Sequence, residues 1–135
     1  MNRQVVRPLP RPDSDTGPYW EAAKQGKLIA QYDSVAEQYR WPPLPYLATG
    51  AGFNIEWREL SGRGTIYSYT IVHPPTHPAF EAPYVVALVE AEESPEVRFV
   101  ANIKNVDLEK LKVGMPVKVQ FETVEDMSLP YFVPG

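Results

Sequence analysis

From about residue 55 onward, short runs of apolar residues alternate with polar ones, the pattern of β-strands. Strands are predicted over 56–60, 65–73, 84–91, 97–103, 117–123 and 129–134. Because the run at 84–91 is apolar nearly throughout, we expect it to be buried on both faces. The strands from 65 onward, with one helical turn capped by Asp107 after the third, follow the order of a five-stranded Greek-key barrel of the OB type. A β-sandwich with the same number of strands would give a similar pattern.

The first third of the chain has a different pattern. Asp15 or Thr16 can cap a helix that runs to about Gln25, with Pro18 in its first turn and Gly26 after its end. KLIAQY at 27–32 predicts a short strand. The segment WPPLPY that follows fits neither a helix nor a central strand, because its prolines lack the N–H group that both need.

Composition and charge exclude several classes of function. The 135 residues include 15 prolines and no cysteine, so disulfides, thiolate metal sites and a cysteine nucleophile are excluded. The net charge is −4, and the excess lies in 84–135, which carries nine acidic and five basic residues. Such a chain offers no basic groove for a phosphate backbone, so no nucleic-acid partner is expected. With no apolar run long enough to span a bilayer and no apolar stretch at the N-terminus, we expect a cytoplasmic protein without a membrane partner.

No self-sufficient active site is visible. His73 and His77 lie in a proline-rich loop without a third ligand nearby, which favours a solvated loop over a metal site. Glu90, Glu92 and Glu93 end a strand, where a solvated turn is a simpler interpretation than acid–base chemistry. The serines lack a GxSxG context, and no phosphate-binding glycine loop is present.

Two tyrosines in the 65–73 strand are candidates for a binding surface. Tyr67 and Tyr69 are two residues apart, so a regular strand would place them on one face. OB folds use such faces to stack bases, but an acidic chain favours packing in the core or at a protein interface.

Several segments together resemble a known family. They are YWEAAKQGKLIAQY at 19–32, SGRGTIYSYTIVH at 61–73, FEAPYVVALVE at 80–90, DLEKLKVGMPVKVQFE at 107–122 and LPYFVP at 129–134. In this order and spacing they resemble the acyl-CoA-associated proteins known as domain of unknown function 35. The resemblance implies a mainly β chain with three parts: an N-terminal arm, helix and strand (1–32), a rubredoxin-like zinc ribbon (33–54) and a C-terminal OB-fold barrel (55–135).

The ribbon departs from the family pattern. Its two CxxC pairs would fall at Asp33 and Ala36 and at Leu47 and Gly50, and none of these residues is a cysteine. Zinc needs about four soft or imidazole ligands, so we predict a degenerate ribbon without metal. Tyr39, Trp41 and Tyr46, with the prolines between them, are predicted to pack as a cluster in its place. The alternative is a partly disordered loop that orders only on a partner.

The resemblance also implies a function. Family members work beside thiolase-fold enzymes, including retro-aldolases acting on steroid side chains, or beside hydratases. It therefore implies a non-catalytic accessory subunit of a hetero-oligomer that shares acyl-CoA with its partner and binds no cofactor tightly. Arg40, Trp41 and Arg63 are the candidate CoA contacts. The candidate partner surface comprises Tyr39, Trp41, Tyr46, Tyr67 and Tyr69. A single-stranded nucleic-acid-binding OB protein and a stand-alone acyl-CoA enzyme remain the alternatives.

Overall fold

The computed structural model describes residues 7–43 and 54–135. Helix α1 (Gly17–Lys24) begins after Thr16, and a carboxylate oxygen of Asp13 accepts hydrogen bonds from the N–H groups of Asp15 and Thr16 just before it. Pro18 lies in its first turn, where a missing N–H group costs nothing. Gly26 follows the helix with φ of +73°, a backbone conformation that favours glycine.

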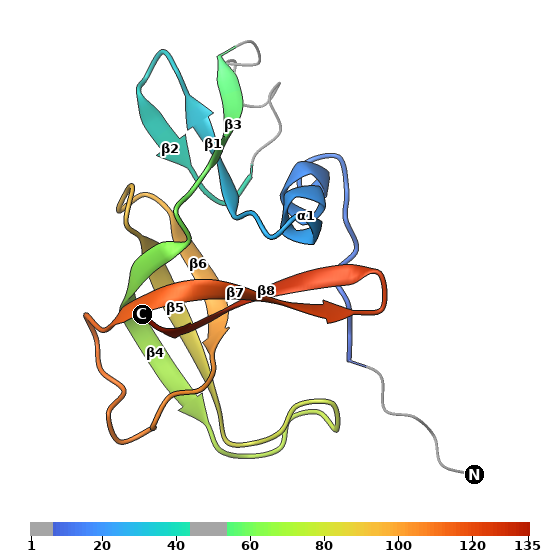
Figure 1. Ribbon diagram of the computed structural model, residues 1–135, viewed down its shortest axis with the longest axis vertical. Helices are drawn as coiled ribbons and strands as arrows, with labels where there is room; N and C mark the ends of the chain where they lie inside the picture. The colour runs from blue at the N-terminus through green and yellow to red at the C-terminus, as the bar shows by residue number, and fades with distance from the viewer. Residues whose placement is uncertain (1–6, 44–53) are drawn as a thin grey trace.

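A small antiparallel sheet has β1 (Ile29–Asp33) at its centre, between β2 (Gln38–Arg40) and β3 (Ile55–Glu59) (Figure 1). β1 pairs with β3 along its whole length, from Ile29 opposite Glu59 to Asp33 opposite Ile55. The strand expected at the start of the OB segment therefore pairs outside the barrel, with the strand that follows α1.

The remaining strands form a closed barrel in the order β4-β5-β6-β8-β7, which confirms the predicted OB-type fold. The strands are β4 (Arg63–Val72), β5 (Tyr84–Ala91), β6 (Arg98–Ile103), β7 (Pro116–Val124) and β8 (Met127–Pro134). β6 and β8 run parallel and close the barrel through the pair Ile103 and Phe132. At the expected helical turn, the structure has a turn in which Lys110 N–H donates to the Asp107 carbonyl.

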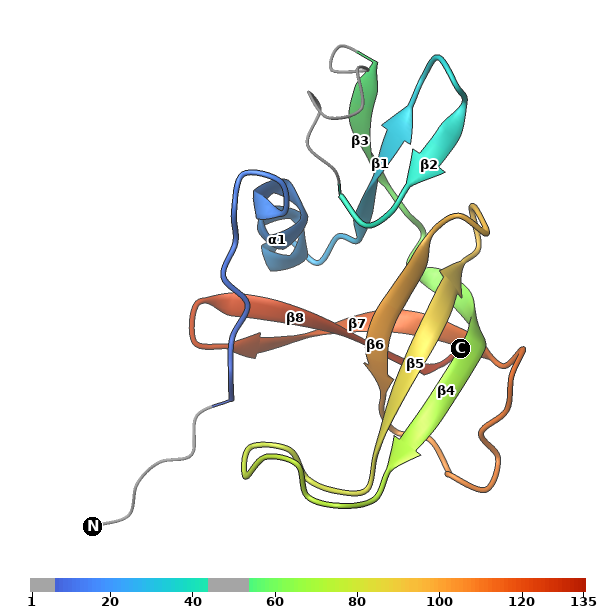
Figure 2. The same cartoon turned by 180° about the vertical axis from the view of Figure 1, so that it is seen from behind.

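The barrel interior is apolar and continues into the helix and the small sheet. Ile66, Val89 and Phe132 are almost fully buried within it. Trp41 joins the two parts, because its ring lies 5.0 Å from the Tyr19 ring of α1 and 4.6 Å from the Phe99 ring of β6. Figure 2 shows α1 beside the small sheet and next to β8. The described part of the chain contains no helix long and apolar enough to cross a membrane.

The prediction that β5 is buried on both faces is wrong. Alternate residues of the strand point to opposite sides. Val85, Ala87 and Val89 are buried in the barrel interior, whereas Val86 and Leu88 are half-buried on the outer side. A small barrel fills its interior with one face of each strand and leaves the other face outside. The apolar side chains on the outer face of β5 therefore lie at the surface of the barrel.

Candidate docking face and ligand cleft

A β-bulge in β4 separates the two tyrosines predicted to share a face. The pairing between β4 and β5 shifts between Ile66 and Ser68, so Tyr67 is the extra residue. Tyr69 then faces inward, opposite Ala87, and its hydroxyl donates to the Leu111 carbonyl over 3.2 Å. The prediction of one shared face is wrong, because an inserted residue reverses the alternation that follows it.

Tyr67 remains outside and forms part of an exposed apolar surface with Val86, Leu88 and Val100, which we call the outer apolar face. Tyr67 is 47% exposed and Val100 is 74% exposed. Leu88 of β5 pairs directly with Val100 of β6, so the apolar side chains are neighbours across the strands. A small monomeric protein rarely leaves adjacent large apolar side chains open to water unless they bind something.

Charged residues border the outer apolar face on one side. The Arg98 guanidinium lies 3.9 Å from the centre of the Tyr67 ring, within the range of a cation–π contact. Its Nε atom is also 3.8 Å from a carboxylate oxygen of Glu90, the residue opposite it on β5. This arrangement of apolar centre and charged edge is typical of protein interfaces.

A hollow of about 450 Å³ adjoins this face and extends it toward the small sheet. It is lined by Trp41, Pro42, Pro95, Glu96, Arg98 and Val100. Trp41 thus packs on the core through Tyr19 and Phe99 and also presents surface beside Val100. The structure therefore joins the predicted binding residues Trp41 and Tyr67 to one continuous surface through Arg98 and Val100.

Arg40 is already engaged within the small sheet. Its guanidinium donates to Oδ2 of Asp33 over 3.1 Å, while Oδ1 accepts the N–H groups of Val35 and Ala36, both at 3.0 Å. The hydrogen bond from Ala36, with those from Val35 and Arg40, holds the pKa of the Asp33 carboxyl below its ordinary value of 3.8. Asp33 is therefore an ionised carboxylate that fixes the turn after β1.

The residues present do not fit the zinc ion of the family's ribbon. The Asp33 oxygens are occupied by three donors, and Ala36 offers no ligand atom. Leu47 and Gly50 lie outside the described residues, and their side chains also lack ligand atoms. Within residues 7–43 and 54–135, no group of three or more His, Cys, Asp or Glu side chains is placed to hold a metal ion.

The other predicted site residues lie in three places. Tyr39 packs against Tyr32 of β1 at 4.9 Å between ring centres, whereas the ring of Trp41 packs against Tyr19 and Phe99, so the two aromatics meet the core through different ring partners. Tyr46 lies outside the described residues. Arg63 is exposed at the first position of β4, and no contact found in the described ranges joins it to Arg40 or Trp41.

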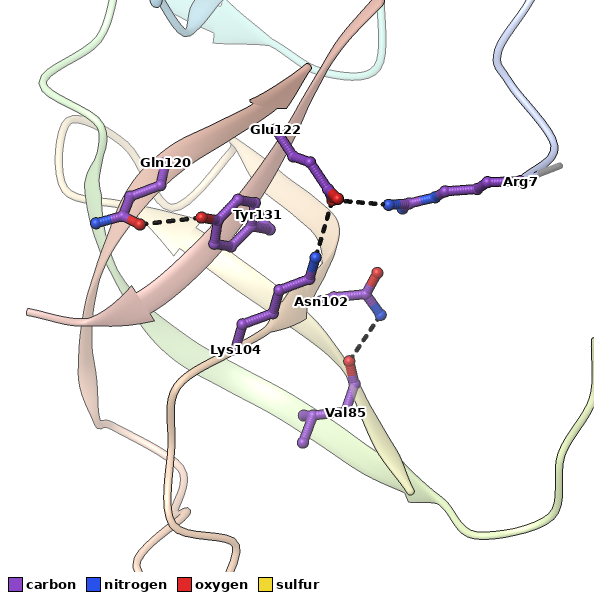
Figure 3. Close-up of polar contacts among 7 residues, drawn as sticks. All are labelled: Arg7, Val85, Asn102, Lys104, Gln120, Glu122 and Tyr131. Carbon is purple, nitrogen blue, oxygen red and sulfur yellow. Dashed lines mark hydrogen bonds and ion pairs between the residues drawn. The ribbon is translucent and has the colours of Figure 1, made fainter. Parts of the chain in front are cut away.

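A larger hollow of about 950 Å³, which we call the OB cleft, lies between the loop that joins β4 to β5 and the β7–β8 turn. Three charged groups meet at its edge (Figure 3): Oε2 of Glu122 accepts hydrogen bonds from Lys104 at 2.9 Å and from Arg7 at 3.1 Å. The Asn102 amide points toward the same region and donates to the Val85 carbonyl over 2.9 Å. Arg7 belongs to the N-terminal arm, and its guanidinium also lies 5.7 Å from the Phe80 ring.

The charges in this cluster are mutually stabilised. The Lys104 hydrogen bond, assisted by Arg7, holds the pKa of Glu122 below its ordinary value of 4.5. This cluster could not be predicted from the sequence, because its members lie far apart in the chain and none of them is distinctive alone. Only the predicted fold pointed to this region, because OB folds bind ligands beside the loop after the first strand and the loop before the last strand.

The remaining candidates have structural contacts. His77 Nδ1 accepts the Ala79 N–H group, and its ring packs 5.2 Å from Phe80. The Ser61 hydroxyl donates to Glu92 over 2.6 Å, which fixes the chain before β4 against the end of β5. Neither arrangement joins a nucleophile to a histidine base.

Comparisons with known proteins identify the family. Residues 57–122 match the family model described as ChsH2, C-terminal OB-fold domain. The chain is 39% identical over 98% of its length to a probable enoyl-CoA hydratase alpha subunit of Thermomonospora curvata, and 34% identical over 88% to a 3-oxo-4,17-pregnadiene-20-carboxyl-CoA hydratase alpha subunit of Mycobacterium tuberculosis. It spans 41% and 38% of the lengths of these relatives.

Two further similarities concern proteins nearer in length. A DUF35 domain-containing scaffold protein of Pyrococcus furiosus is 36% identical over 65% of this chain and 64% of its own length. The solved structure of the Ltp2-ChsH2(DUF35) aldolase contains a chain with TM-score 0.83 and 38% identity, matched over 93% of this chain and 98% of that one. The chain therefore belongs to the DUF35 family, and its barrel is the OB-fold domain of that family.

Proposed function

We propose that this chain is a non-catalytic accessory subunit of an acyl-CoA-processing complex. It docks on a catalytic partner with a thiolase fold, of the thiolase or retro-aldolase type, and helps to form the site at which that partner acts on an acyl-CoA. Two relatives are named as alpha subunits of CoA-ester hydratases, another as a scaffold protein, and the structural neighbour as an aldolase with two named components.

The observation that carries the proposal is the outer apolar face. Tyr67 and Val100 are exposed on its strands beside the half-buried Val86 and Leu88, and the face is bordered by the Arg98–Glu90 pair and continued by the hollow beside Trp41. Because interface cores are apolar and aromatic with charged rims, this surface suits a stable protein partner. The contacts of Ser61, His77 and Glu92 provide no catalytic assembly that competes with this interpretation.

A partner of this class explains why the chain itself needs no nucleophile or general base. The catalytic groups belong to the partner, and the small subunit supplies wall surface for the acyl-CoA. The pregnadiene carboxyl-CoA named for one relative makes a steroid side-chain thioester the first substrate to test.

Reconstitution tests the proposal. A candidate thiolase-fold or hydratase chain from the same organism is purified alone and mixed with this chain, and both complex formation and acyl-CoA turnover are measured. We expect a stable hetero-oligomer, no turnover by this chain alone, and a lower KM for the acyl-CoA in the complex than in the partner alone. Turnover by this chain without any partner would contradict the proposal and favour a stand-alone enzyme.

A further inference from the structure

The OB cleft has the size and the position of a ligand site, although the contacts predicted from sequence lie elsewhere. Its volume of about 950 Å³ is in the range of small-molecule pockets, roughly 300–1,000 Å³. Its walls come from the loop before β5, the end of β6 with the loop after it, and the end of β7. This is the part of an OB barrel that binds chain-like ligands.

The wall of the cleft combines apolar surface with a few polar groups. Phe80, Val106, Leu108 and Val124 supply apolar surface, and Tyr84 adds an aromatic ring near the entrance loop. Asn102, with Lys104 and Arg7, supplies amide and N–H donors. A purely aliphatic ligand would remove water from these polar groups without replacing their hydrogen bonds, which is costly.

The charges of the cleft select against an anionic ligand. Its lining contains the acidic residues Glu81, Glu122 and Glu125 and the basic residues Arg7 and Lys104. Both basic groups already contact Glu122, at 3.1 and 2.9 Å. A phosphate group would therefore meet an excess of negative charge and cations that are already neutralised.

We infer that the OB cleft binds a neutral, flexible chain with amide groups between methylene segments, the chemistry of the pantetheine arm of a CoA thioester. The inference rests on the proposed function, which is the reason for choosing CoA as the ligand. In this inference the chain binds the pantetheine arm of CoA and does not bind its nucleotide. The methylenes lie on Val106, Leu108 and Val124. The amides exchange hydrogen bonds with Asn102 and with donors of Lys104 or Arg7 that Glu122 does not use.

The assignment separates the roles of the two subunits. The phosphorylated nucleotide end stays outside the cleft, and the thioester end continues toward the partner's catalytic groups. The exchange of water for amide–amide hydrogen bonds gives modest affinity, so the chain alone binds the arm weakly and the complex binds the whole ester more tightly.

Nuclear magnetic resonance of the full ¹⁵N-labelled chain tests the inference, with pantetheine and adenosine 3′-phosphate 5′-diphosphate as separate probes. Pantetheine at millimolar concentration is expected to shift the amide signals of the residues that line the cleft, while the nucleotide leaves them unchanged. Val124→Trp, which fills the cleft, should weaken pantetheine binding by about tenfold or more. Val113→Trp is the matched control, because Val113 is 63% exposed and does not line the cleft.

Three results would overturn the inference: no shift of the cleft signals with pantetheine, a shift of those signals with the nucleotide, or equal affinity in Val124→Trp and the wild type. A shift caused by the partner protein without any CoA would assign the cleft to protein docking instead. Complex formation with the partner is measured in parallel. A complex that forms without pantetheine binding refutes this inference alone, whereas pantetheine binding without a complex refutes the proposed function.

Discussion

Arg40 and Asp33 form an ion pair of 3.1 Å across the β1–β2 hairpin, at the position where the family's ribbon begins its first metal-binding turn. The same carboxylate accepts the N–H groups of Val35 and Ala36. A single side chain thus fixes the turn and ties it to β2. Arg40 stabilises the hairpin in this way, and its role as a CoA contact stays a prediction.

Asp33→Asn is expected to lower the melting temperature by several degrees at neutral pH, because the amide retains a backbone acceptor but loses the ion pair. Asp33 has a lowered pKa in the folded state, so its contribution is complete above its ordinary pKa of 3.8 and is lost as the pH falls through the folded value. The difference between the variant and the wild type should therefore shrink in acid. Thermal melts of both proteins from neutral pH to about pH 2 measure this difference in melting temperature. An equal difference at every pH would contradict the role of the charge.

Trp41→Ala should lower the free energy of unfolding by about 2 kcal/mol, because it removes the ring contacts with Tyr19 and Phe99 that join the small sheet and α1 to the barrel. Trp41→Phe retains an aromatic ring and should lose less than half as much. Urea unfolding followed by circular dichroism compares the two. Equal stability of wild type and Trp41→Ala would show that Trp41 serves only as surface.

Gly64→Ala should lower the free energy of unfolding by about 2 kcal/mol, because the added methyl group would press directly against the Glu90 carbonyl of the neighbouring strand. Gly17→Ala is the control, since a methyl group at Gly17 meets nothing within 4 Å at the start of α1. Chemical denaturation of both variants measures the contrast. If Gly64→Ala were as stable as the control, the close pairing of β4 and β5 at this point would be incorrect.

The barrel was predictable because its strands carry strong β-forming runs and its turns carry glycine. The half-exposed outer face of β5 and the separation of Tyr67 from Tyr69 were not predictable, because neither barrel closure nor a single inserted residue leaves a mark in local alternation. Arg7, Lys104 and Glu122 meet through tertiary structure across the N-terminal arm, β6 and β7. Asp33 was singled out as a missing metal ligand, but the sequence did not reveal its pairing with Arg40.

We propose that the chain docks on a catalytic partner through the outer apolar face. Val100→Lys places a charge at its most exposed position, and Val35→Lys changes an equally exposed valine (72%) in the β1–β2 turn. Both variants should fold like the wild type, because surface changes of this kind alter stability little.

Gel filtration of each variant with the thiolase-fold or hydratase partner is the most direct measurement. We predict that Val35→Lys co-elutes with the partner as the wild type does, whereas Val100→Lys binds at least about tenfold more weakly and elutes separately. Full co-elution of Val100→Lys, or release of Val35→Lys in its place, would contradict docking through the outer apolar face.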